Sequence, residues 1–89
     1  PNPFNPETHI KFNIPVESKV SIKIYNILGQ EIIELTSGNR IPGFYEIVWE
    51  GKNKNHQSVA SGMYIYQIYA QSVDGTQRFV QSKKMLLLH

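Results

Sequence analysis

Apolar and polar residues alternate with a period of two along most of this chain, and almost no segment shows the spacing of an amphipathic helix. In residues 8–14, THIKFNI, the apolar Ile10, Phe12 and Ile14 are separated by polar residues, and residues 18–26, SKVSIKIYN, repeat the pattern. Because successive side chains of a strand point to opposite faces, this alternation predicts strands with one buried face. The chain is therefore expected to fold as an all-β protein.

Turn-forming residues separate these segments at regular intervals. Further strands are predicted at 31–35, 44–50, 59–72 and 76–88, with polar loops at 37–43 and 51–58. In all we expect about seven short antiparallel strands, packed as an immunoglobulin-like β-sandwich. The 89 residues are enough for a single domain, 1–89. Antibody domains carry a cysteine pair that this chain lacks, so the prediction concerns architecture alone.

Glycines and one aspartate mark the predicted turns. Gly29 follows the second strand, and Asp74-Gly75 predicts a two-residue hairpin, which needs positive φ at both central positions. Gly51 and Gly62 are predicted to form turns on either side of the polar loop.

Composition excludes several classes of function. The chain has no cysteine, so it can form no disulfide, thiol nucleophile or thiolate zinc site. The formal charge is +2 with scattered basic residues, so we expect no nucleic-acid partner. No apolar run approaches the roughly 18 residues of a membrane span, and the first residues lack the pattern of a signal peptide. The first residue is not methionine, and we expect the chain to be a domain of a longer protein.

No pattern of residues predicts catalysis. The histidines at positions 9, 56 and 89 have no metal-ligand spacing, and His9 and His56 are expected to be exposed. Glu46 and Glu50 lie four residues apart on one strand face, about 13 Å at the usual strand rise, which is too far for them to cooperate directly. There is no G-x-S-x-G segment and no glycine-rich phosphate loop. We therefore expect a protein that is not an enzyme, with no catalytic, cofactor or metal site.

Four aromatic residues allow a different interpretation. Tyr25, Tyr45, Tyr69 and Trp49 could form a flat platform for sugar rings. Aromatic residues that alternate along strands more often fill the core or edges of a sandwich. A carbohydrate-binding module therefore stays an alternative to the main hypothesis.

The chain also resembles a known family along its whole length. The segments PNPFNPETHIKFNIP, VSIKIYNILGQEI, GFYEIVWEG, VASGMYIYQI and KKMLLL are similar, in order and spacing, to the C-terminal sorting domain of the type IX secretion system. The same pattern overlaps with the immunoglobulin-like domain of flagellar hook-capping proteins. This chain departs from it at Glu50, where an aspartate is usual, at Asn55 and His56, near which a glycine is usual, and at His89, where a basic residue is usual.

The resemblance implies a folded tag at the end of a cargo protein. Its implied partners are an outer-membrane translocon, a sortase-like peptidase and an N-terminal cargo domain, and its implied location is the cell surface or the medium, reached through the periplasm. The resemblance assigns a role to two sets of residues in this sequence. The domain starts with Pro1, Asn2, Pro3, Phe4, Asn5 and Pro6, and the export signal comprises Lys84, Met85, Leu86, Leu87 and Leu88.

Two physical expectations accompany these residue sets. Residues 1–7 should run extended, because proline fixes φ and has no amide hydrogen to donate. The last strand should lie at a sheet edge, where a receptor can add a strand, while Met85 and Leu87 can still face the core. A passive immunoglobulin-like spacer or assembly module is the other alternative.

Overall fold

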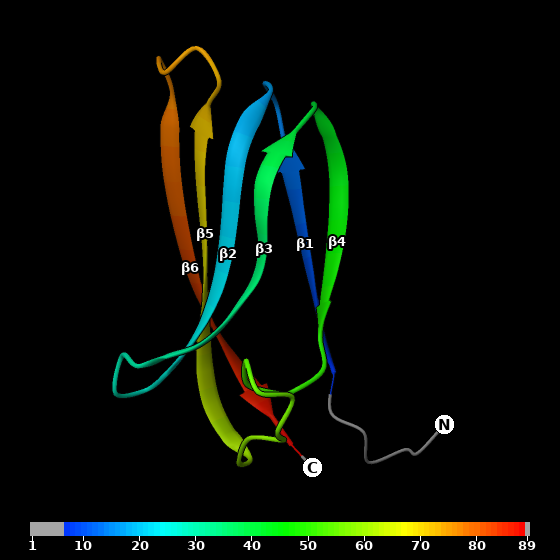
Figure 1. The fold of residues 1–89 in the computed structure, drawn as a ribbon, viewed down its shortest axis with the longest axis vertical. Helices are drawn as coiled ribbons and strands as arrows, with labels where there is room; N and C mark the ends of the chain where they lie inside the picture. The colour runs from blue at the N-terminus through cyan, green and yellow to red at the C-terminus, as the bar shows by residue number, and fades with distance from the viewer. Residues whose placement is uncertain (1–6, 89) are drawn as a thin grey trace.

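The computed structural model describes residues 7–88, which form six antiparallel strands and no helix (Figure 1). The predicted start of the domain, residues 1–6, and His89 lie outside the described residues. The strands are β1 (Thr8–Ile14), β2 (Ser18–Asn26), β3 (Glu31–Arg40), β4 (Gly43–Trp49), β5 (Gly62–Ser72) and β6 (Arg78–Leu87). They form a four-stranded sheet in the order β3-β2-β5-β6 and a two-stranded sheet of β1 and β4. The predicted all-β, immunoglobulin-like class is confirmed.

The strand count is six rather than about seven. Each of the six segments predicted as strands contains or overlaps one observed strand, and residues 7–88 contain no seventh. The segment predicted at 76–88 is a single strand, since β6 pairs with β5 without interruption from Gln71↔Arg78 to Gly62↔Leu87. The loop between these two strands is also longer than predicted. It spans residues 73–77, and of Asp74 and Gly75 only the glycine has a positive φ, +76°, so the two-residue hairpin is not formed.

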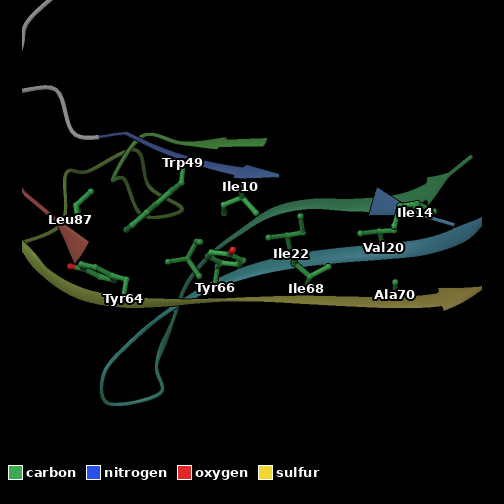
Figure 2. Close-up of a cluster of buried hydrophobic side chains, with 11 residues drawn as sticks. Ile10, Ile14, Val20, Ile22, Trp49, Tyr64, Tyr66, Ile68, Ala70 and Leu87 are labelled. Carbon is green, nitrogen blue, oxygen red and sulfur yellow. The ribbon is translucent and has the colours of Figure 1, made fainter. Parts of the chain in front are cut away.

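The core lies between the two sheets and consists of the side chains on the inner face of each strand. Figure 2 shows Ile22, Tyr66 and Ile68 of the larger sheet facing Ile10 and Trp49 of the smaller one. The buried apolar residues are Ile10, Ile14, Val20, Ile22, Ile24, Trp49, Tyr64, Tyr66, Ile68, Ala70 and Leu87. All of them occupy the apolar positions of the period-two pattern, which explains why the pattern predicted these strands correctly.

Two aromatic side chains close one end of this core. Trp49 and Tyr64 pack edge to face with their ring centroids 5.1 Å apart, a favoured aromatic geometry. The Trp49 indole N–H donates to the carbonyl of Lys52 at 3.0 Å, and the Tyr64 hydroxyl donates to the carbonyl of Ala60 at 2.6 Å. Each ring is therefore buried with its polar atom hydrogen-bonded.

Strand β3 is twice as long as predicted and is irregular. Its register against β2 shifts between Ile22 and Lys23 and again between Ile24 and Tyr25, which leaves Leu35 and Ile32 as extra residues. Such bulges reset the alternation of side chains, so Ile32, Ile33 and Leu35 all pack against the core. The segment EIIEL has no strict alternation for this reason. Residues 37–40, predicted as loop, continue the strand opposite 18–21.

The two sheets do not cover each other completely. In Figure 1, β6, β5, β2 and β3 follow one another across the molecule, and β1 and β4 lie beyond β3, on the side away from β6. The smaller sheet covers residues of β2 and β5, whose inward side chains are buried, but not the first seven residues of β6, which are all exposed. Strand β6 is left at an open edge.

Candidate functional site

The candidate site is β6, which contains most of the residues predicted to act in export. It is the last strand in the order β3-β2-β5-β6, and no described strand pairs with its outer side. Half of its backbone N–H and C=O groups therefore point away from the sheet. A regular row of such groups is a template for the addition of another strand.

The first seven residues of β6, Arg78 to Lys84, are all exposed. Phe79, Gln81 and Lys83 stand opposite Ala70, Ile68 and Tyr66 of β5, whose side chains are buried. Residues directly opposite each other in an antiparallel pair project to the same face. This row of β6 therefore faces inward, but the smaller sheet does not cover it.

The end of β6 is anchored differently. Leu87 is 2% exposed, and Met85 packs against the core. Leu86 and Leu88 are 57% and 66% exposed, and Lys84 is exposed as well. The predicted export residues thus divide into two that hold the strand to the core and three that face solvent.

The edge strand is also positively charged. Arg78, Lys83 and Lys84 lie on it, and residues 75–88 contain no aspartate or glutamate. Lysines on an edge strand discourage unspecific pairing with other copies of the chain. They also favour a partner that carries negative charge near the added strand.

The predicted turn residues occupy several kinds of position. Gly29 and Gly51 have φ values of +83° and +73°, which favour glycine, and Gly51 is buried. Gly62 is the first residue of β5 and stands opposite Leu87. Gly75 lies in the loop between β5 and β6.

The loop between β5 and β6 is built around Asp74. One oxygen of this carboxylate accepts hydrogen bonds from the Thr76 backbone N–H at 3.0 Å, the Ser72 hydroxyl at 2.7 Å and the Thr76 hydroxyl at 2.7 Å. These bonds, from the Thr76 N–H first and then the Ser72 hydroxyl, lower the pKa of Asp74 to about 2. Asp74 therefore holds the start of β6 in place.

Sequence reasoning missed a pair of equivalent loops at 26–30 and 53–57. In NILGQ, the side-chain oxygen of Asn26 accepts hydrogen bonds from the N–H groups of Leu28 and Gln30, both at 3.0 Å. In NKNHQ, the side-chain oxygen of Asn53 accepts the N–H groups of Asn55 and Gln57, at 2.9 and 3.0 Å. Both are asparagine-based turns with the same spacing. An Asn followed four residues later by Gln was the available signal.

A second missed feature is the contact of His9 with two glutamates. Its Nε2 lies 3.0 Å from a Glu7 oxygen and its Nδ1 lies 3.0 Å from a Glu46 oxygen. Hydrogen bonds to Glu7 and then Glu46 raise the pKa of His9 above its ordinary value of 6.5. His9 is exposed, as predicted, but it ties the residue before β1 to strand β4.

The four aromatic residues of the predicted sugar platform do not lie together. Trp49 is 1% exposed and belongs to the core. Tyr45 stacks on Phe12 with ring centroids 5.5 Å apart, and its hydroxyl donates to the Ile41 carbonyl. Tyr25 and Tyr69 lie on the opposite, outer face of the larger sheet, where they line one pocket. The platform as predicted is wrong, because alternation sends Trp49 inward.

Among residues 7–88 there is no helix long and apolar enough to cross a membrane.

Comparisons with known proteins agree with this fold. No curated protein matches the chain in a sequence search. Among solved structures, dimeric latent PorU from Porphyromonas gingivalis is similar with a TM-score of 0.69 and 20% identity, over 99% of this chain and 9% of that one. FlgD from P. aeruginosa is similar with a TM-score of 0.64 and 23% identity, over 92% of this chain and 59% of that one. At these identities the likeness concerns the fold alone.

The chain therefore spans only part of each of these two proteins. The family comparison is more specific, since residues 5–74 match the FlgD Ig-like domain. This match includes β1 to β5 and ends before β6. The chain belongs to the FlgD Ig-like domain family.

Proposed function

We propose that this domain is a C-terminal sorting domain, which directs an attached cargo protein across the outer membrane through the type IX secretion system. The observation that carries the proposal is the open edge of β6, which holds all but the last residue of the segment KKMLLL of the sorting-domain resemblance. A translocon component would recognise this strand by pairing with its outer backbone groups.

The division of the export residues supports this role. A signal strand has to be held in one conformation, because ordering the strand during binding would cost affinity. It also has to be accessible to its receptor. Leu87 and Met85 satisfy the first need by packing against the core. Lys84 and Leu86 satisfy the second, since they are exposed on the same strand, as does the exposed Leu88 directly after it.

The size of the domain is consistent with a tag. The similar regions of PorU and FlgD are parts of longer chains, so this fold occurs as one unit of a larger protein. The FlgD Ig-like match favours a second candidate function, a spacer or assembly module, because that match does not depend on β6. The two candidates differ in whether β6 is recognised.

The test is the export of a reporter that has its own signal for entry to the periplasm and is fused through its C-terminus to residues 1–89. It is expressed in a bacterium with a type IX system and in the same strain without the translocon. We expect the reporter at the surface or in the medium only in the intact strain. Retention in the periplasm of both strains, with the domain folded, would contradict the proposal and favour the spacer.

Charge reversal then tests the strand itself. The double variant Lys83→Glu, Lys84→Glu changes exposed residues of β6 and should abolish export, with a change in folding free energy within about 0.5 kcal/mol per site. The matched control is Lys52→Glu, Lys54→Glu, which makes the same change in charge on exposed residues of the loop 51–58. Equal export of both variants would show that the translocon does not recognise the charges of β6.

A further inference from the structure

A shallow pocket lies on the outer face of the larger sheet, between β2 and β5. Its volume is about 190 Å³, and it is lined by Ser21, Lys23, Tyr25, Gln67 and Tyr69. All five side chains are half-buried and project away from the core, since they alternate with its buried residues. Nothing in the sorting function or in the fold requires two tyrosines at this place.

The pocket is built on the centre of the larger sheet. Strands β2 and β5 are the two central strands of the larger sheet, and each is paired on both sides. Ser21 stands opposite Tyr69, and Lys23 stands opposite Gln67. The floor is therefore a regular cross-strand ladder that fixes the positions of the side chains.

The polar groups of the pocket are already paired with neighbours at its rim. The Lys23 ammonium lies 3.1 Å from a Glu31 carboxylate oxygen, and the Ser21 hydroxyl donates to a Glu34 carboxylate at 2.8 Å. The Gln67 amide lies 3.5 Å from the Ser82 hydroxyl. Each of these groups has further capacity to donate or accept. Because the single cation of the pocket is neutralised by Glu31, the site offers hydrogen bonds without a net positive charge.

From this geometry we infer that the pocket binds one pyranose unit of a neutral glycan. A sugar ring presents C–H groups to a tyrosine face and hydroxyl groups around its rim, which matches Tyr25 and Tyr69 beside Ser21, Lys23 and Gln67. The pocket is smaller than the roughly 300–1,000 Å³ of sites for drug-sized ligands, which agrees with a single sugar unit whose chain continues over the rim.

Other classes of ligand fit less well. A peptide strand cannot be added here, because the backbone groups of β2 and β5 are paired with neighbouring strands on both sides. The lining contains no aliphatic side chain for a peptide anchor. An anion would meet the Glu31 and Glu34 carboxylates beside Lys23. The inference does not depend on the sorting function, and the two can fail separately.

The experiment is a titration of ¹⁵N-labelled protein with cellohexaose, maltohexaose and chitohexaose, each to about 10 mM so that millimolar binding is visible, and with a hexagalacturonate as an anionic probe. We expect at least one neutral oligosaccharide to shift amide signals within residues 21–25 and 65–69. Tyr69→Ala should weaken that binding roughly 3- to 10-fold. Tyr69→Phe retains the ring and should bind within about 2-fold of the original protein.

Phe44→Ala is the matched control, since Phe44 is an aromatic residue of the smaller sheet that is 88% exposed. It should leave sugar binding unchanged. The inference is overturned if no neutral oligosaccharide shifts any signal, if the shifts map outside the pocket, or if only hexagalacturonate binds. It is also overturned if Phe44→Ala weakens binding as much as Tyr69→Ala. Should Tyr69→Ala fail to fold, Tyr25→Ala gives the same comparison.

Discussion

The two asparagine-based loops allow backbone strain to be measured by exchanging one residue type. The loop 53–57 has the hydrogen bonds of the loop 26–30, but His56 occupies the position that Gly29 occupies in the other. Their φ values are +63° and +83°, and His56 is the one residue other than glycine with positive φ among residues 7–88. We predict that His56→Gly stabilises the domain and that Gly29→His destabilises it.

The magnitude follows from two opposing effects. A residue with a Cβ atom pays about 1–2 kcal/mol for left-handed geometry. Glycine avoids this cost but loses about 0.5–1 kcal/mol more conformational free energy on folding. The difference predicts that His56→Gly raises the free energy of unfolding by about 0.5–1 kcal/mol. Gly29→His should lower it by a similar amount, because a Cβ added at Gly29 meets no atom within 4 Å.

Urea unfolding followed by tryptophan fluorescence is the assay. Trp49 is the sole tryptophan and is 1% exposed, so its emission should change when the core opens. The urea midpoint should rise for His56→Gly at unchanged slope. The melting temperature should rise by about 2–8 °C for a domain of this size.

A third variant separates strain from side-chain contacts. His56→Ala removes the imidazole and keeps the Cβ atom, so its stability should stay within about 0.5 kcal/mol of the original. If His56→Gly and His56→Ala both lowered stability, the imidazole would be making a stabilising contact, and the strain argument would be refuted. If Gly29→His cost nothing, the left-handed geometry itself would not be strained.

Three further predictions concern single side chains. Leu87→Ala should lower the free energy of unfolding by about 2–5 kcal/mol and Leu86→Ala by less than about 0.5 kcal/mol, since only Leu87 is buried; equal effects in urea unfolding would contradict this arrangement of β6. The pKa of Asp74 is about 2 in the folded domain, so the stability that its hydrogen-bonded carboxylate adds is present above pH 3.8 and is lost as the pH falls through 2. Asp74→Asn should therefore reduce the dependence of folding stability on pH between these two values. An unchanged pH profile would rule out this role of the carboxylate. The pKa of His9 is raised, so the stability that its contacts add is fully present below pH 6.5 and is lost as the pH rises through the raised pKa. Glu46→Gln should lower the pKa of His9, measured by an NMR titration of the imidazole. An unchanged pKa would argue against the contact between His9 and Glu46.

The sequence predicted the strands whose register is regular. The pairings of β1 with β4 and of β2 with β5 have no register shift, so alternation placed Ile10, Ile22 and Ile68 on the correct face. The length of β3 could not be predicted, because its two bulges are visible only from its pairing with β2. Period-two reasoning fails wherever one extra residue resets the faces.

The candidate site was predicted in part for the same reason. The assignment of Leu87 to the core and Leu86 to solvent follows from alternation alone. The contact of His9 with Glu46 joins residues 37 positions apart and depends on the register of β1 against β4, which no local pattern contains. That Tyr25 and Tyr69 line one pocket likewise depends on the register of β2 against β5, which places Ser21 opposite Tyr69.

The two outer strands of the larger sheet differ in a way that limits assembly. Extra residues interrupt the β3 ladder at Leu35 and Ile32, so that edge offers no even row of backbone groups. The β6 ladder is uninterrupted over ten residues. A sheet with two receptive edges can extend in both directions and grow into a fibre, whereas a sheet with one can join a single strand and then stop. The larger sheet therefore has one edge, β6, to which another strand can be added. We expect strand pairing through this sheet to give a complex with one partner molecule.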